Sequence, residues 1–177
     1  VAFACTVLAS MHYTSTRLES KAALVASQKA EPMLRRALVF DTSGEVAFDL
    51  GVYLLATGRS EEAARFLEQS NERFANVGTW VALGNAYAAN GDWSRARDAF
   101  EHATHLHPGS LKGQANLAEA ERQLGHLAEA RQAATRARAI APFHPKVLDL
   151  LEHLEIDSAA SEELKGVDID DDGDVSP

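Results

Sequence analysis

The sequence predicts an all-α protein whose helices pair in antiparallel hairpins and stack side by side. Strand signals are nearly absent, because alanine, leucine, glutamate and arginine dominate the 177 residues. One pattern of large, small and turn-forming residues also recurs at shifts of 33 and 34 residues. Such a period is typical of repeat proteins, in which each helix pair buries its apolar face against the next copy. The apolar fraction of 46% makes a buried core feasible in one domain of this length.

The clearest copy of the pattern lies at residues 77–110. Its large apolar residues recur every three to four positions, which places them on one face of each helix. Gly84 and Ala96 are small where the two helices must approach closely. Between the helices, Gly91 can take the left-handed conformation and Asp92 can cap the second helix. The full signature is Trp80, Leu83, Gly84, Tyr87, Gly91, Ala96, Phe100, Ala103 and Pro108.

Two neighbouring copies keep part of this signature. The copy at residues 111–144 keeps Leu117, Ala118, Gly125, Ala130, Ala137 and Pro142. The copy at residues 44–76 keeps Leu50, Gly51, Leu54, Gly58, Ala63 and Leu67. With these positions, residues 44–144 resemble the tetratricopeptide repeat (TPR) family. The resemblance implies a right-handed superhelix of stacked antiparallel helix pairs that binds other proteins.

The two ends of the array carry weaker signals. Residues 145–157 are expected to form a C-terminal capping helix, which shields the last core layer from water. Its expected apolar stripe is Val147, Leu148, Leu151 and Leu154. Residues 13–43 are expected to be helical with a degenerate leading repeat, because part of the pattern recurs 33 residues before the copy at residues 44–76. Residues 158–177 are expected to be an acidic, disordered tail.

In TPR proteins the first helix of each pair lines a concave groove, so the resemblance assigns a candidate peptide-binding face. Its residues are Phe48, Val52, Leu55, Val81, Asn85, Lys112, Asn116, Glu119, Arg122 and Lys146. The face is apolar at its N-terminal end and charged at its C-terminal end. We therefore expect a protein or peptide partner with apolar and acidic character. The alternative is that Phe48, Val52 and Leu55 are covered by the N-terminal segment and belong to the core.

Some TPR domains hold a C-terminal carboxylate with two lysines, two asparagines and an arginine. Asn85, Asn116 and Lys146 match three of these five positions. Val81 and Leu150 stand where the other lysine and the arginine would be. We therefore do not expect a chaperone-type clamp, although other cations of the face can still pair with an acidic ligand.

One segment has the spacing of a metal site. Asp168, Asp170, Asp172 and Asp174 resemble the first part of an EF-hand calcium loop, in which carboxylates alternate along the chain. As given, the sequence ends before the glutamate that closes such a loop. The expectation is weak Ca²⁺ binding at this tail, with a plain acidic tail as the alternative. No other cofactor is expected.

Charge is concentrated at one end of the chain. Residues 158–177 hold seven acids and one base, a balance of −6, which leaves −3 of the net −9 for the other residues. Neither part is basic, so nucleic acid is not an expected partner. The sequence shows no nucleophile motif, cysteine–histidine pair or phosphate-binding glycine loop, so we expect a binding protein and no enzyme.

Residues 1–12 are mostly apolar, but they are too few to span a bilayer, which needs about 20 residues. They match the end of a membrane or signal helix, with an amphipathic helix packed on the first repeat as the alternative. We therefore expect membrane contact through residues 1–12 and favour a membrane-tethered protein of the bacterial cell envelope. The expected role is a scaffold in assembly of an envelope complex. Two alternatives are the soluble TPR tail of a polytopic membrane glycan transferase resembling O-antigen ligases, and a calcium-dependent extracellular adaptor.

Overall fold

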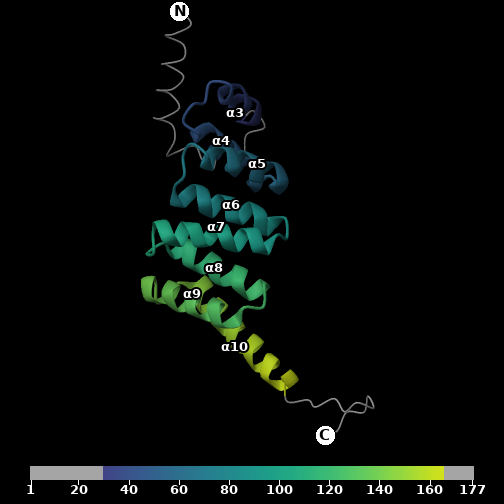
Figure 1. The fold of residues 1–177 in the computed structure, drawn as a ribbon, viewed down its shortest axis with the longest axis vertical. Helices are drawn as coiled ribbons and strands as arrows, with labels where there is room; N and C mark the ends of the chain where they lie inside the picture. Colours follow the sequence, from purple (N-terminus) through teal and green to yellow (C-terminus); the bar gives the residue numbers. More distant parts are fainter. Residues whose placement is uncertain (1–29, 166–177) are drawn as a thin grey trace, which may run out of the picture. The chain divides into compact units, whose positions relative to one another are not determined.

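The computed structural model describes residues 30–165, with side chains described through Asp157. Eight α-helices and no strands occur in this range (Figure 1), which confirms the all-α prediction. They are α3 (Ala30–Leu38), α4 (Glu45–Ala56), α5 (Ser60–Asn71), α6 (Val77–Ala89), α7 (Trp93–Leu106), α8 (Leu111–Gln123), α9 (Leu127–Ile140) and α10 (Pro145–Lys165). The sequence divides between Phe74 and Ala75 into two compact units, here called unit 1 and unit 2.

Unit 1 is built around the α4–α5 pair, and α3 packs against α4. The two paired helices approach closely because Gly51 has no side chain. A Cβ atom at Gly51 would lie only 2.6 Å from Cγ of Leu67 on α5. Leu50, Leu54 and Leu67 are fully buried and form the centre of this unit. The turn between α4 and α5 contains Gly58, whose φ of 79° is a left-handed conformation that glycine adopts without strain.

A four-residue charge network ties α3 to the start of α5. Arg59 donates to both oxygens of Glu31 at 2.7 and 2.8 Å and also binds Glu62. Arg35 donates to Glu31 and Glu62 as well, so each arginine contacts both carboxylates. Hydrogen bonds from Arg59 and then Arg35 hold the pKa of Glu31 below its usual value. Together with the burial of Leu34, this network gives α3 a fixed place in unit 1.

The first turn of α4 is held by a single carboxylate. Asp41 accepts backbone N–H bonds from Ser43 and Gly44 through Oδ1, and from Val46 and Ala47 through Oδ2, at 3.0–3.1 Å. Burial alone would raise the pKa of Asp41, but these hydrogen bonds outweigh it and lower the pKa. The carboxylate therefore satisfies donors that the beginning of a helix leaves unpaired.

Unit 2 contains two helix pairs, α6–α7 and α8–α9, followed by α10. In Figure 1, α6 to α10 follow one another through the unit. Gly84 lies against the ring of Phe100, and a Cβ there would come within 2.6 Å of Cδ1. In the turn after α6, Gly91 has a φ of 78° and the Asp92 side chain caps α7, as the sequence predicts.

The last helix differs in two ways from the sequence prediction. α10 buries Val147, Leu150 and Leu154, whereas Leu148 is 44% exposed. The predicted stripe was therefore right at Val147 and Leu154 and wrong at Leu148, because packing against α8 and α9 buries Leu150 in its place. The helix also continues to Lys165 instead of ending at residue 157, because no glycine or proline interrupts it before Gly166.

Among residues 30–165, no helix is both long and apolar enough to cross a membrane. The segment for which the sequence predicts membrane contact, residues 1–12, lies outside the described residues.

Candidate functional site

A row of hydrogen bonds connects α6, α8 and α10 in unit 2. Asn116 on α8 donates from Nδ2 to Oδ1 of Asn85 on α6 at 2.9 Å. Its own Oδ1 accepts a hydrogen bond from Nζ of Lys146 on α10 at 3.2 Å. Three residues of the predicted peptide-binding face are thus brought together from three different helices. Because α6, α8 and α10 are the first helices of successive repeats, this row follows the face that the sequence assigned.

A second polar group lies one turn further along α8. Arg122 binds Glu119 with two hydrogen bonds, Nε to Oε2 at 3.1 Å and Nη2 to Oε1 at 3.0 Å. Its Nη1 binds Oδ2 of Asp157 on α10 at 3.0 Å. Hydrogen bonds from Glu119 and then Asp157 raise the pKa of Arg122 further above its usual value. Two carboxylates therefore already balance the guanidinium charge, and Arg122 connects α8 to α10.

Glu119 is ionised in this arrangement. Burial by itself would raise the pKa of Glu119, but the hydrogen bonds from Arg122 and Gln123 outweigh it and lower the pKa. The pair is therefore charged on both sides near neutral pH, and it is only partly exposed.

A shallow hollow of about 370 Å³ lies between α8 and α10 beside these two groups. Its lining residues are Glu119, Arg122, Lys146, Asp149, Leu150 and His153. Leu150 is 5% exposed and gives the hollow an apolar contact, whereas the other lining residues are polar or charged. The sequence analysis placed Leu150 only where a clamp arginine would stand and did not predict that it is buried. The burial of Leu150 could have been found only by choosing Leu150 instead of Leu148 for the apolar stripe of α10.

The other predicted face residues differ in exposure. Lys112 is exposed on α8, but Val81 on α6 is only 9% exposed and belongs mainly to the core of unit 2. In unit 1, α4 holds Phe48, Val52 and Leu55 half-buried. These three side chains are neither fully covered nor fully open to solvent, and they remain a candidate apolar surface of unit 1.

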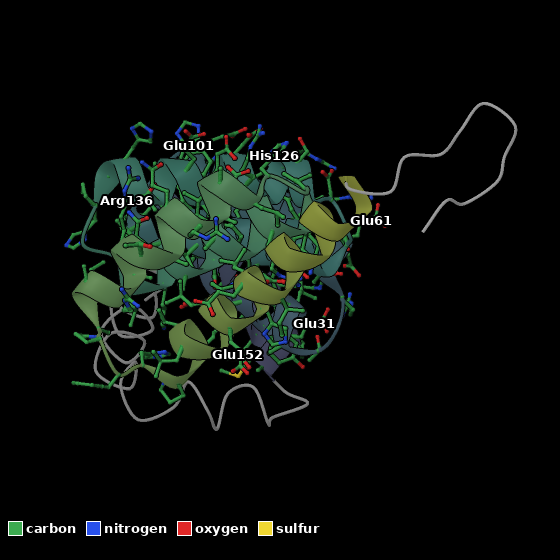
Figure 2. The ribbon with its side chains drawn as sticks, turned by 90° about the horizontal axis from the view of Figure 1, so that it is seen from below. Glu31, Glu61, Glu101, His126, Arg136 and Glu152 are labelled. Atoms are coloured by element: carbon green, nitrogen blue, oxygen red, sulfur yellow. The ribbon has the colours of Figure 1, made fainter. Side chains whose placement is uncertain are left out.

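A second hollow, of about 520 Å³, lies on the outer side of α7 in unit 2 and is lined by Asp98, Glu101, His102 and His105. The His102 ring stacks on Trp80, with ring centroids 4.4 Å apart. Figure 2 shows Glu101 on the opposite side of the unit from Glu152 of α10.

Over the described residues, no three histidine, cysteine or acidic side chains are placed to hold a metal ion. The predicted calcium ligands, Asp168, Asp170, Asp172 and Asp174, lie outside those residues, so Ca²⁺ binding there stays a prediction.

Comparison with known proteins identifies the repeat. Two family models, both described as tetratricopeptide repeat, match residues 44–69 and 81–145. The chain belongs to the tetratricopeptide repeat family. No curated protein is similar enough to count as a match. The resemblance seen in the sequence is thus confirmed over most of the three repeats.

Solved structures share the TPR fold. One is a MamA structure, MSR-1 C2, with a TM-score of 0.70 and 23% identity over 86% of this chain and 88% of that chain. A second is the second TPR domain of human RPAP3 in complex with the HSP70 peptide SGPTIEEVD, with a TM-score of 0.59 and 21% identity over 64% and 92%. A third is PcrH in complex with the chaperone binding region of PopD, with a TM-score of 0.60 and 20% identity over 66% and 92%. At these identities the likeness shows a common fold, which is generally an interaction module.

Proposed function

We propose that this TPR protein is an interaction scaffold, and that unit 2 binds an extended peptide across α6, α8 and α10. The observation that supports this most directly is the Asn85–Asn116–Lys146 row. An asparagine amide has two donor hydrogens and an acceptor oxygen, and the row uses only part of this capacity. The remaining donors and acceptors can pair with the backbone of a peptide whatever its sequence.

The charges of the face favour an acidic group in the peptide. Lys112 and Lys146 are exposed, and neither forms an ion pair within the described part of the chain. Arg122, by contrast, is balanced by Glu119 and Asp157. We therefore assign recognition of acidic groups to the two lysines, and a positioning role to Arg122.

Apolar contacts complete the proposed recognition. Leu150 lies beside Lys146 in the hollow of unit 2, so an apolar side chain next to an acidic one fits there. Phe48, Val52 and Leu55 offer unit 1 an apolar surface of its own. The similar structures of RPAP3 and PcrH hold an HSP70 peptide and a region of PopD, respectively, which supports the choice of a peptide as ligand.

The test uses the full chain and a phage-displayed library of random peptides, followed by fluorescence anisotropy on the selected sequences. Peptides with an acidic residue next to an apolar one are expected. The variant Lys146→Glu should weaken their binding about tenfold or more, which corresponds to about 1.4 kcal/mol. The double variant Asn85→Ala with Asn116→Ala should have a similar effect. Arg136→Glu, an exposed charge reversal on α9, is the matched control and should leave affinity within about twofold.

Equal binding by wild type, Lys146→Glu and the double asparagine variant would overturn the proposed face. Circular dichroism of each variant distinguishes a lost contact from a lost fold, because all three side chains are at least partly exposed.

A membrane-tethered role in assembly of an envelope complex is the setting that the sequence favours for this scaffold. It is supported by the apolar composition of residues 1–12. Flotation of the full chain with lipid vesicles should show binding that deletion of residues 1–12 removes. If both forms float equally or neither floats, the proposed tether is wrong.

A further inference from the structure

The arginines of unit 2 fall into two groups. Those outside α9 each bind a carboxylate within the described residues. The pairs are Arg95 with Asp92, Arg97 with Asp98, and Arg122 with Glu119. α9 carries three arginines and a single glutamate, and none of its arginines forms an ion pair among the residues described. Arg131, Arg136 and Arg138 are all exposed, so α9 presents uncompensated positive charge in a chain whose net charge is −9.

The repeat shows which way two of these side chains lie. With the shift of 34 residues, Arg131 and Arg138 correspond to Arg97 and Thr104 on α7. The methyl group of Thr104 lies 3.2 Å from where a Cβ of Gly113 on α8 would be, so this flank of α7 faces the next helix. The same flank of α9 therefore faces α10, which packs against it.

Arg136 lies on the other flank of α9. Helical geometry turns each residue by about 100°, which places Arg136 opposite Arg131 and Arg138 across the exposed surface of the helix. In Figure 2, Arg136 lies well apart from Glu152 on α10. The helix thus provides an internal comparison, since it carries a third exposed arginine away from α10.

We propose that the arginines on the α10-facing flank of α9, Arg131 and Arg138, dock the acidic C-terminal segment of the same chain, residues 166–177. This segment contains five aspartates and no basic residue. Aspartate carboxylates and arginine guanidinium groups form charge-assisted, often bidentate, hydrogen bonds. Because the segment is covalently attached, its effective concentration at α9 is in the millimolar range, so individually weak pairs suffice.

The chain lengths agree with this docking. A short turn joins α9 to α10, so the two helices run antiparallel, and α10 passes back along α9. With a rise of about 1.5 Å per residue, the 21 residues of α10 are about 30 Å long and the 14 residues of α9 about 20 Å. Lys165 therefore lies about 20 Å from the level of Arg131 and about 30 Å from that of Arg138.

The twelve residues that follow Lys165 can extend to about 40 Å, which covers both arginines. Fully extended at about 3.3 Å per residue, the chain would place Asp170 to Asp174 between about 15 and 30 Å from Lys165. The densest run of acids can thus reach the level of the two arginines.

The experiment places a nitroxide spin label on the full chain at Ser176→Cys in a Cys5→Ser background, because Cys5 is the only cysteine. Paramagnetic broadening of ¹⁵N-labelled backbone amides then reports where the tail lies. At about 20 mM NaCl the amides of residues 131–138 should be broadened, and at about 0.5 M NaCl the broadening should be largely lost, because salt screens exposed charges. Arg131→Gln with Arg138→Gln should abolish it at low salt, whereas the control Arg136→Gln should retain it.

Three results would overturn the proposal. The first is no broadening on α9 at low salt. The second is broadening centred instead on Lys112 and Lys146, which would place the tail on the peptide-binding face. The third is equal broadening in the Arg131/Arg138 and Arg136 variants, which would show that the contact does not depend on the flank that faces α10.

Discussion

The contact between Gly84 and Phe100 allows a sharp test of how the helices of unit 2 pair. A methyl group added at Gly84 would lie 2.6 Å from Cδ1 and 2.8 Å from Cζ of the buried Phe100 ring. Overpacking of this kind costs about 1–3 kcal/mol, while replacing a helical glycine by alanine gains up to about 1 kcal/mol. Because three atoms of the Phe100 ring would lie closer than 3.0 Å, we take the upper part of the overpacking range, about 2–3 kcal/mol. Less about 1 kcal/mol of helix propensity, Gly84→Ala is expected to destabilise unit 2 by about 1–2 kcal/mol.

The sign of that change should reverse when the ring is removed. Phe100→Ala alone should cost about 3–5 kcal/mol, because a fully buried phenylalanine is truncated. In this background Gly84→Ala no longer meets the ring, and it should stabilise by about 1 kcal/mol. The double variant would then resemble the third repeat, where alanines occupy both equivalent positions, Ala118 and Ala134. The coupling between the two substitutions is expected at about 2–3 kcal/mol.

Urea unfolding followed by tryptophan fluorescence measures this cycle in unit 2 alone, because both tryptophans, Trp80 and Trp93, belong to that unit. Ala118→Gly is the matched control. It relieves no clash, so it should destabilise by about 1–2 kcal/mol, through helix propensity and the loss of a buried methyl group. If Gly84→Ala changes stability by the same amount with and without Phe100, the close approach of the two helices is not what requires glycine.

Three further predictions concern other positions. Burial raises the pKa of Asp49 to about 6, above its unfolded value of 3.8, so unit 1 loses stability as pH rises from about 4 to 6. Asp49→Asn should remove this pH dependence and stabilise unit 1 by about 1–2 kcal/mol at pH 7, measured by circular dichroism melts. An unchanged pH profile in the variant would contradict this prediction. The pKa of Asp41 is lowered, so its effect on stability runs the other way: the ionised carboxylate stabilises unit 1 above about pH 4, and this stabilisation is lost at lower pH. Asp41→Asn should therefore cost about 1–2 kcal/mol at pH 7 and have little effect at pH 2. Leu150→Ala should cost about 2–4 kcal/mol by urea unfolding, whereas the exposed Leu148→Ala should change stability by less than about 0.5 kcal/mol, and equal losses would show that α10 packs on another face.

Residues whose role is local were predictable from the sequence. Gly91 adopts the left-handed turn and Asp92 caps α7, because both roles depend only on backbone geometry within a few residues. The repeat period likewise placed Gly84 against the following helix, since a small residue at that position is required wherever two helices touch.

Burial and ion pairing that depend on contacts between helices could not be predicted from the sequence in the same way. Leu148 and Leu150 lie on either side of the stripe formed by Val147, Leu151 and Leu154, and only contact with α8 and α9 decides that Leu150 is buried and Leu148 exposed. Arg122 meets Asp157 across 35 residues of sequence, and no spacing rule identifies such a partner. For that reason the sequence could place Arg122 on the candidate face but could not show that its charge is already balanced.

The same repeat arithmetic supports the prediction that α10 is a capping helix. The position of Gly84 in the second repeat is Ala118 in the third and Glu152 in α10. In the two complete pairs this position is buried against the second helix of the pair, whereas Glu152 is exposed. A further helix packed there would bury the Glu152 carboxylate without a counter-charge, which costs several kcal/mol. In α10, the exposed Glu152 therefore occupies the position that packs against a partner helix in the two complete pairs. The proposed docking of the acidic tail then needs only the flank of α9 and leaves this side of α10 in water.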